Sequence, residues 1–323
     1  GARGRSCDVH RSSPQNISRR SMSYALLDIE EYVEQAYFFR TFRERLEENI
    51  PSQEILIGLK EEILATTKLP MAIDFLVGEM VLNGHMAAGM ARLRHYFTEF
   101  QTFIVAAAED DYSRFDQRTA LEILQHEAEY RTKGPTPAGL FVYQFECLSR
   151  NKLGYDRGMQ AMSSDPLYDE NWSQWISRTR LKLGTTDFAD LISLRSQYFV
   201  DEFRRSSRNA DFEPPEPVLF SSKAGRIAYA NRGRDPLYMF AALQRHLGYP
   251  AVPRPQPKNS QESLIAALQA KLQQMEKRLT LLERESKNQL DLSEFYVKPE
   301  IPAQSPWKDA AQKELRDHDD TAP

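Results

Sequence analysis

The stretch at residues 84–109 reads GHMAAGMARLRHYFTEFQTFIVAAAE and decides the fold. Its apolar residues recur every three or four positions in two separate runs, as in helices that bury one face. The first run is Met86, Met90 and Leu93, and the second is Phe100, Phe103, Ile104 and Ala107. Phe97 and Thr98 fall between the runs, and Thr98 is a residue type that starts helices. We therefore predict two short amphipathic helices that meet at an aromatic corner.

Three more helices are predicted before this stretch. Residues 24–50 have the pattern of one long helix with a single buried face. Its apolar positions are Ile29, Val33, Ala36, Phe39, Phe42, Leu46 and Ile50. A second helix covers residues 55–63, and a third opens at Pro70 and stops at Gly84, because glycine adopts the left-handed conformation that ends helices. Gly78, inside the third helix, predicts close packing against a neighbour.

The predicted fold class is all-α, in eight consecutive parts. These are a disordered extension at 1–21, a six-helix bundle at 22–134, a second helical region at 135–205, a Pro-rich linker at 206–222, a small helical segment at 223–249, a second Pro-rich linker at 250–259, a coiled coil at 260–290 and a disordered tail at 291–323. Thr136 followed by Pro137 is a strong start signal for the first helix after the bundle. Met22 is the start of translation that we expect.

The segment at 260–290 has the most regular periodicity in the sequence. Its apolar residues alternate spacings of three and four, which defines the a and d positions of a heptad. They are Ile265, Leu268, Leu272, Met275, Leu279 and Leu282. In a parallel pair the basic residues at g face acidic residues at e of the other copy, so both pairs attract. These are Lys271 and Arg278 at g, and Glu276 and Glu283 at e. We predict a parallel homodimer; the alternative is a single amphipathic helix that packs on its own bundle.

Composition limits the classes of function. The net charge is −4, and residues 1–21 contain five arginines against one aspartate, so the remainder carries −8. That balance argues against a general nucleic-acid-binding surface. Cys7 and Cys147 are the only cysteines and lie far apart, which argues against a disulfide framework or a zinc site and favours a reducing compartment. No apolar run approaches the roughly 18 residues of a membrane-spanning helix.

The order of features around this stretch resembles the cytoplasmic helical domain of the platform protein in bacterial type II secretion and type IV pilus assembly. That family has an apolar helix that ends in Gly, a small-residue helix with an Ala-Leu step, a Phe that opens the next helix, and a Val-x-x-Gly-Glu run. Gly84, the step at 91–93, Phe97 and the run at 105–109 stand in that order here. The resemblance covers about residues 36–131.

The resemblance implies a non-catalytic scaffold or adaptor without a cofactor. It implies contact with an assembly ATPase and other inner-membrane assembly proteins, and a place in the cytoplasm or at the surface of the inner membrane. The candidate contact residues are Gly84, Phe97 and Glu109 from the motif, together with Asp110 and Asp111, which form with Glu109 an acidic cluster that could bind a cation or a basic partner. The chain departs from the family in two respects. It has neither glycine of the family's Gly-Glu-x-x-Gly motif around Glu109, and no membrane-spanning run follows the domain.

Two other classes of function stay open. Glu122, His126 and Glu129 have the spacing of one helix face, which is how helical bundles hold metal ions in enzymes, although a salt-bridged surface has the same pattern. A nucleic-acid-binding or regulatory coiled-coil protein is the other class, with a basic run that could hold phosphate or an acidic protein surface. That run is Lys223, Arg226, Arg232 and Arg234, with Tyr229 among them. Cys147 lies in an apolar helical context and is interpreted as a buried small hydrophobe.

Overall fold

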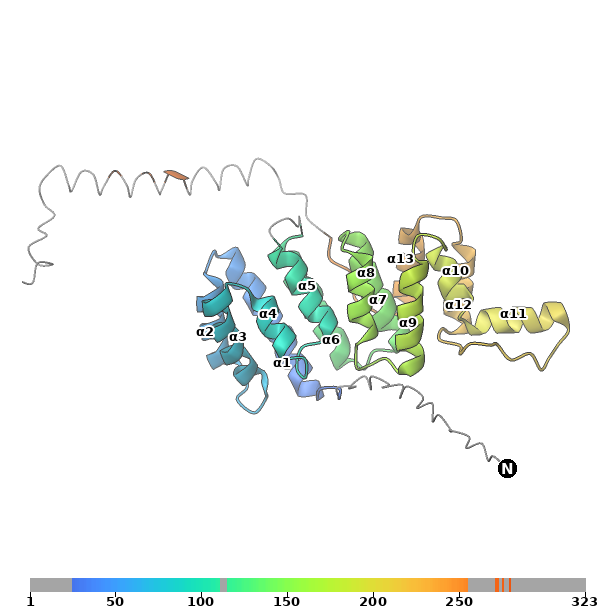
Figure 1. Cartoon of the computed structure of the whole chain (residues 1–323), viewed down its shortest axis with the longest axis horizontal. Coiled ribbons are helices and arrows are strands. Elements are labelled where there is room, and N and C mark those ends of the chain that lie inside the picture. The colour runs from blue at the N-terminus through green and yellow to red at the C-terminus, as the bar shows by residue number, and fades with distance from the viewer. Residues whose placement is uncertain (1–24, 111–114, 255–270, 273–274, 276–278, 280–323) are drawn as a thin grey trace, which may run out of the picture. The chain divides into compact units, whose positions relative to one another are not determined.

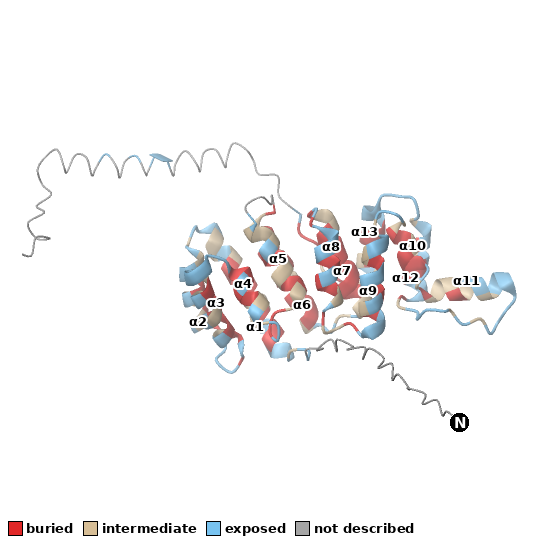
Figure 2. Ribbon diagram, viewed as in Figure 1, coloured by how far each residue is buried: buried red, intermediate tan, exposed pale blue. Residues whose placement is uncertain are grey.

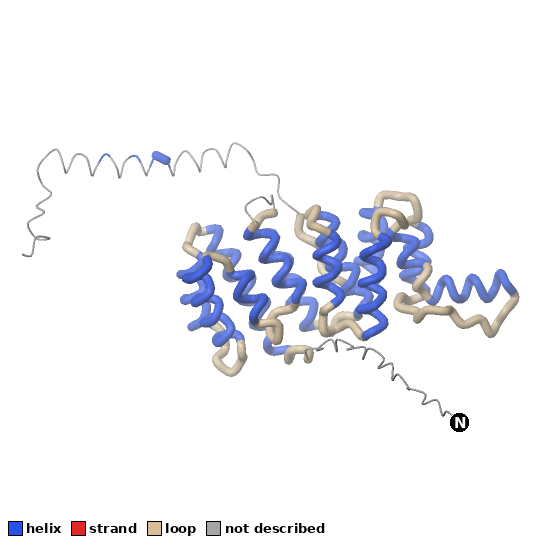
Figure 3. Tube along the Cα trace, viewed as in Figure 1, coloured by secondary structure: helices blue, strands red, loops and turns tan. Residues whose placement is uncertain are grey.

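The computed structural model of this chain describes residues 25–110 and 115–254, and residues 271–272, 275 and 279 farther on. The part described up to residue 254 contains thirteen helices and no β-strand, only two isolated bridges (Figure 1). The all-α fold class predicted from the sequence is therefore confirmed for this part, in which short loops connect most of the helices (Figure 3). These helices belong to one compact unit, Gly1–Pro255, and the residues from Gln256 onward belong to a second.

The helices follow one another along the chain in the order of their numbers. They are α1 (Ile29–Glu47), α2 (Ser52–Glu62), α3 (Leu69–Asn83), α4 (Met86–Arg92), α5 (Glu99–Glu109), α6 (Gln117–Thr132), α7 (Pro137–Arg150), α8 (Tyr155–Ser163), α9 (Glu170–Lys182), α10 (Phe188–Ser193), α11 (Gln197–Ser207), α12 (Ser222–Ala230) and α13 (Pro236–Leu247).

Local start and stop signals place many of these helix ends. Thr98 caps α5 with a full capping box, in which its hydroxyl accepts from Gln101 N and the Gln101 side chain accepts from Thr98 N. Thr136 caps α7, whose first residue is Pro137, as the sequence predicts. Gly84 ends α3 with a φ of 73°, a left-handed conformation that glycine adopts without strain. At each of these three ends, the residues that start or stop the helix lie within one turn of the end itself.

The hydrophobic core is continuous from Phe38 to Val252 (Figure 2). Helix α1 packs mainly against α6, α5 contacts α8, and α7 contacts α13. The core therefore runs on across residue 134, where the sequence predicts the end of a bundle. A cluster of aromatic rings fills the part around α7, and its tightest pair is Phe145 and Phe188, stacked with ring centroids 3.8 Å apart.

The predicted buried face of α1 is confirmed at Phe39 and Phe42, which are fully buried, but not in the first turns of the helix. The helix begins at Ile29 rather than near residue 24, and both Ile29 and Val33 are exposed. Polar side chains take their place in the interior. Gln35 accepts a hydrogen bond from Gln101 Nε2 at 3.2 Å. The neighbouring turn of the same face is also buried, and its side chains make polar contacts of their own. The apolar pattern misplaces only the first turns of the buried face, because buried polar groups are stable when they are paired.

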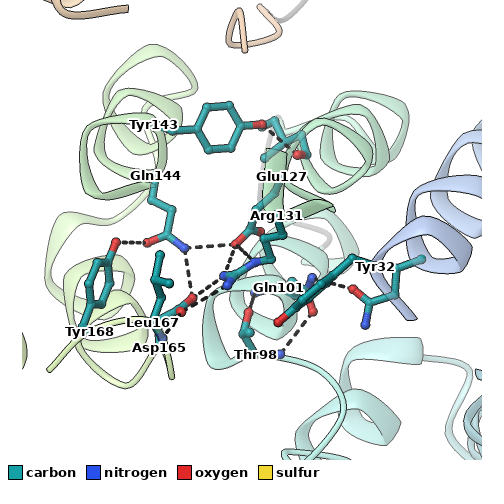
Figure 4. Close-up of polar contacts among 12 residues, drawn as sticks. Tyr32, Thr98, Gln101, Glu127, Arg131, Tyr143, Gln144, Asp165, Leu167 and Tyr168 are labelled. Carbon is teal, nitrogen blue, oxygen red and sulfur yellow. Dashed lines mark hydrogen bonds and ion pairs between the residues drawn. The ribbon is translucent and has the colours of Figure 1, made fainter. Parts of the chain in front are cut away.

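Arg131, on α6, is the centre of a polar network inside the core (Figure 4). Its guanidinium donates to Glu127 Oε1, 2.6 Å from Nη2, and to Asp165 Oδ1, 3.3 Å from Nη1. Gln144, on α7, donates from Nε2 to Glu127 at 3.1 Å and to Asp165 at 3.3 Å. Tyr168 donates to Gln144 Oε1 at 2.9 Å. Side chains of α6 thus hold both α7 and the segment between α8 and α9.

The charges of this network are removed from water. The Arg131 side chain is 2% exposed, and those of Glu127 and Asp165 are fully buried. Burial acts to lower the pKa of Arg131, but the two carboxylates outweigh it and hold that pKa well above its ordinary value. Burial also raises the pKa of Glu127, against the attraction of the guanidinium. Glu127 Oε2 has no hydrogen-bond partner among the described residues. The buried carboxylates of the network therefore depend strongly on Arg131, the one cation that compensates their charge.

Replacing Arg131 with methionine is expected to lower the free energy of unfolding by about 3–5 kcal/mol, because two buried carboxylates would lose their counter-charge. Urea unfolding followed by circular dichroism measures this change. Arg118, an exposed residue of the same helix, gives the matched control, and Arg118→Met is expected to change the free energy by no more than about 0.5 kcal/mol. Equal effects of the two substitutions would contradict a central role for Arg131.

Candidate functional site

Helix α3 is mostly apolar on its outer side as well as its inner side, which is unusual for a helix at the edge of its unit. It contains 15 residues, of which only Asp74 and Glu79 carry charge. Its inner face is buried against neighbouring helices and comprises Leu69, Ala72, Ile73 and Leu76. Helix α3 packs against α1, α2 and α4 and lies at the outer edge of the helical unit in Figure 1. Helices that are apolar all round are normally enclosed, so the outer face of α3 is exceptional.

The outer face of α3 exposes large apolar side chains to solvent. Met71 is 70% exposed, Val81 is 65% exposed and Leu82 is 78% exposed. Gly78 lies on the same side, and a Cβ atom added there would meet no atom within 4 Å. The prediction that Gly78 marks close packing is therefore wrong within the described residues, because its side of the helix has no neighbour. These four residues are called the α3 face below.

Neighbouring residues extend and border this surface. Phe75 is half-buried, and the Arg92 guanidinium of α4 lies over its ring, 5.1 Å from the centroid. On the α2 side, Lys60 Nζ pairs with Asp74 Oδ1 at 2.8 Å. Ile57, one turn before Lys60, is also exposed. Asp74 lies on the outer side itself, between Met71 and Gly78, so the surface combines exposed apolar side chains with one paired carboxylate. Apolar and charged groups also occur together in many protein–protein interfaces.

The corner after α3 depends on a carboxylate from the end of α5. Glu109 accepts hydrogen bonds from Met86 N at 2.6 Å and from Ala87 N at 2.9 Å, the first amides of α4. Those amides have no partner within their own helix, and a negative charge at a helix N-terminus is stabilising. His85 Nδ1 lies 4.0 Å from the same carboxylate. Glu109 therefore fixes the direction in which the chain leaves α3 at Gly84.

The candidate contact residues lie in different surroundings. Gly84 and Glu109 lie together at the corner between α3 and α4. Phe97 is buried in the core, where its ring meets Tyr96 at a centroid distance of 5.0 Å. Asp110 is exposed and follows the last residue of α5, and Asp111 lies outside the described residues. The α3 face itself was not among the predicted site residues, although a 15-residue helix with two charges was a signal for it.

The proposed metal-binding face has its side chains engaged in other contacts. Glu122 pairs with Arg43 at 3.4 Å, His126 Nδ1 lies 3.1 Å from Ala251 O, and Glu129 accepts from Gln125 Nε2 at 2.8 Å. Among the residues that the structure describes, no group of three or more His, Cys, Asp or Glu side chains is placed to hold a metal ion.

Two other features predicted from the sequence are accounted for by contacts within the fold. Arg232, of the basic run, pairs with Asp190 and lies over the Tyr229 ring, 4.3 Å from its centroid. Cys147 is fully buried, and burial raises the pKa of its thiol well above the ordinary value. A thiol that stays protonated is a poor nucleophile, so Cys147 acts as part of the core.

Comparison of the chain with protein-family models, with curated proteins and with solved structures finds no match. None of the helices in the described part of the chain combines the length and the apolar character that crossing a membrane requires.

Replacing Glu109 with alanine is expected to lower the free energy of unfolding by about 1–3 kcal/mol, since two helix-end amides would lose a charged acceptor. Thermal and urea unfolding measure this loss. Glu61→Ala removes an exposed carboxylate of α2 as the control and is expected to change stability by less than about 0.5 kcal/mol. If Glu109→Ala is as stable as the control, the carboxylate does not hold the corner.

Proposed function

We propose that this chain is a non-catalytic helical scaffold or adaptor that binds another protein through the α3 face. The single observation that carries the proposal is the exposure of Met71, Val81 and Leu82 on one side of an apolar helix. Exposed apolar side chains gathered on one surface are typical of sites at which another protein binds. Covering them would remove apolar area from water, which stabilises a complex by roughly 25 cal/mol per Å² before the costs of association.

The resemblance to the secretion and pilus platform domain gives the proposal a class of partner. It implies an assembly ATPase or another assembly protein at the inner membrane, and hence a place in the cytoplasm or at that membrane's surface. The proposed surface adjoins Gly84, a residue that the resemblance marks for contact. Glu109 supports it indirectly, because its bonds to Met86 N and Ala87 N hold the start of α4, the helix that follows α3 after Gly84.

We also propose that the chain forms a parallel homodimer through the heptad at 260–290. Leu272, Met275 and Leu279 support this, because each is helical and at least half exposed. They occupy successive a, d and a positions, the seam that a second copy covers in a coiled coil. The other core positions, Ile265, Leu268 and Leu282, lie outside the described residues. A dimer would present two α3 faces and so increase the avidity for a partner that has repeated subunits.

The partner is tested by affinity capture of the tagged full chain from its native cells, followed by mass spectrometry. We expect a secretion or pilus ATPase, or another assembly component, with the unchanged chain, and at least tenfold less with Leu82→Lys, since a charge there would have to be buried. Leu181, a leucine of α9 that is 75% exposed, provides the control, and Leu181→Lys should retain the partner. Recovery that is equal for both variants, or that contains no assembly component, refutes the proposed partner.

The oligomeric state is tested by light scattering of the full chain after size exclusion. We expect twice the mass of one chain, and a single-chain mass for the double variant Leu272→Lys with Leu279→Lys, because two charges would enter the seam. The double isoleucine variant at the same positions keeps an apolar seam and is expected to remain dimeric. A lysine variant that keeps the mass of a dimer shows that the heptad is not the interface.

A further inference from the structure

A cavity of about 210 Å³ lies between α9, α10, α11 and the Pro-rich segment that follows α11. That segment is part of the long loop between α11 and α12 in Figure 3. The apolar lining of the cavity consists of Trp175, Leu191, Leu194, Phe199, Pro214 and Pro215. This volume is larger than that of an engineered apolar cavity of about 150 Å³ that binds benzene, so it has room for one aromatic ring.

The end of the Pro-rich segment is fixed in place, so the cavity has a stable wall. Leu219 N and Phe220 N both donate to Arg195 O, at 2.8 and 3.0 Å. The Phe220 ring is buried between two tryptophans, with centroid distances of 5.1 Å to Trp172 and 5.4 Å to Trp175. Sequence alone predicts a linker at 206–222, whereas its C-terminal part is bound to the helices.

The polar lining of the cavity is mainly basic. Arg178, Lys182 and Arg195 contribute three positive charges, and Glu216 contributes one negative charge. The Glu216 carboxylate pairs with Arg178 at 3.1 Å and also with Arg195. Two guanidinium groups, one from α9 and one from the turn between α10 and α11, thus converge on one carboxylate, a geometry that also suits an external carboxylate or phosphate. The lining keeps an excess of two positive charges in a chain whose net charge is negative.

We propose that this cavity is a binding site for a small amphipathic anion, with an apolar body about the size of one aromatic ring and one carboxylate or phosphate group. The body packs against Trp175 and Leu191, and the anionic group binds Arg178 and Arg195. Glu216 is the internal competitor, because its carboxylate occupies the guanidinium groups in the absence of ligand. The site differs from the α3 face and does not depend on the proposed scaffold function.

This arrangement makes the effect of Glu216 on affinity opposite to that of an ordinary binding residue. Loss of its charge frees two guanidinium groups, so the affinity for an anion rises. Loss of Arg178 removes a charge-assisted hydrogen bond, so the affinity falls. Arg178 is the arginine to replace, because its side chain is 60% exposed whereas that of Arg195 is 10% exposed and packed inside the fold. Glu213, an exposed glutamate of the same segment that does not line the cavity, is the matched control.

The test is calorimetric titration of the full chain with phenyl phosphate and with phenylacetate, compared with inorganic phosphate and benzyl alcohol. At least one aromatic anion should bind about tenfold more tightly than either fragment and should change tryptophan fluorescence, since Trp175 lines the cavity. Glu216→Gln should tighten that binding about tenfold, Arg178→Gln should weaken it about tenfold, and Glu213→Gln should leave it unchanged.

Three results would overturn the proposal. They are the absence of binding by both aromatic anions, equal binding of inorganic phosphate, and a Glu216→Gln variant that binds no more tightly than Glu213→Gln. The melting temperature of each variant, measured without ligand, shows whether it is folded. Because Glu216 is about half exposed and Arg178 is more exposed still, both variants should fold.

Discussion

A guanidinium buried in a protein keeps its charge and must find its acceptors inside the fold. Arg131 meets this requirement with Glu127 on its own helix and Asp165 from the segment after α8. The acceptors have strict positions, because hydrogen bonds weaken steeply with misalignment. Helix α7 is bound in turn through Gln144, which donates to both carboxylates. The packing of the central helices therefore depends on one ion-pair network as well as on apolar contact.

A second constraint acts at the edge of the unit. The corner between α3 and α4 needs an acceptor for two amides, and Glu109 provides it from the end of α5. This contact holds the start of α4, directly after the left-handed Gly84 that ends α3. Met71, Val81 and Leu82 stay exposed on the outer side of α3. Packing within the described residues accounts for the inner face of α3, whereas the apolar outer side chains have no partner there.

The two proposed sites differ in chemistry, so each suits a different kind of molecule. The α3 face is open, apolar and on the surface of a helix, which suits another protein. The cavity beside α9 is small, and Arg178 and Arg195 converge on one acceptor there, which suits a small anion. Each site is built from helices held by a polar contact elsewhere, namely Glu109 for the first and the Arg195 carbonyl for the second.

The sequence by itself determined the all-helical class, the buried positions Phe39 and Phe42 of α1, and the helix ends at Thr98, Thr136 and Gly84. These features depend on residues within a turn or on a regular period. Tertiary structure alone decided the polar first turns of the buried face of α1, the network around Arg131 and the exposure of the α3 face. It also decided the cavity, whose lining comes from residues 175–216. The physical reason is that the burial and pairing of a side chain depend on residues distant along the chain. The type of one residue does not tell which distant residue will contact it.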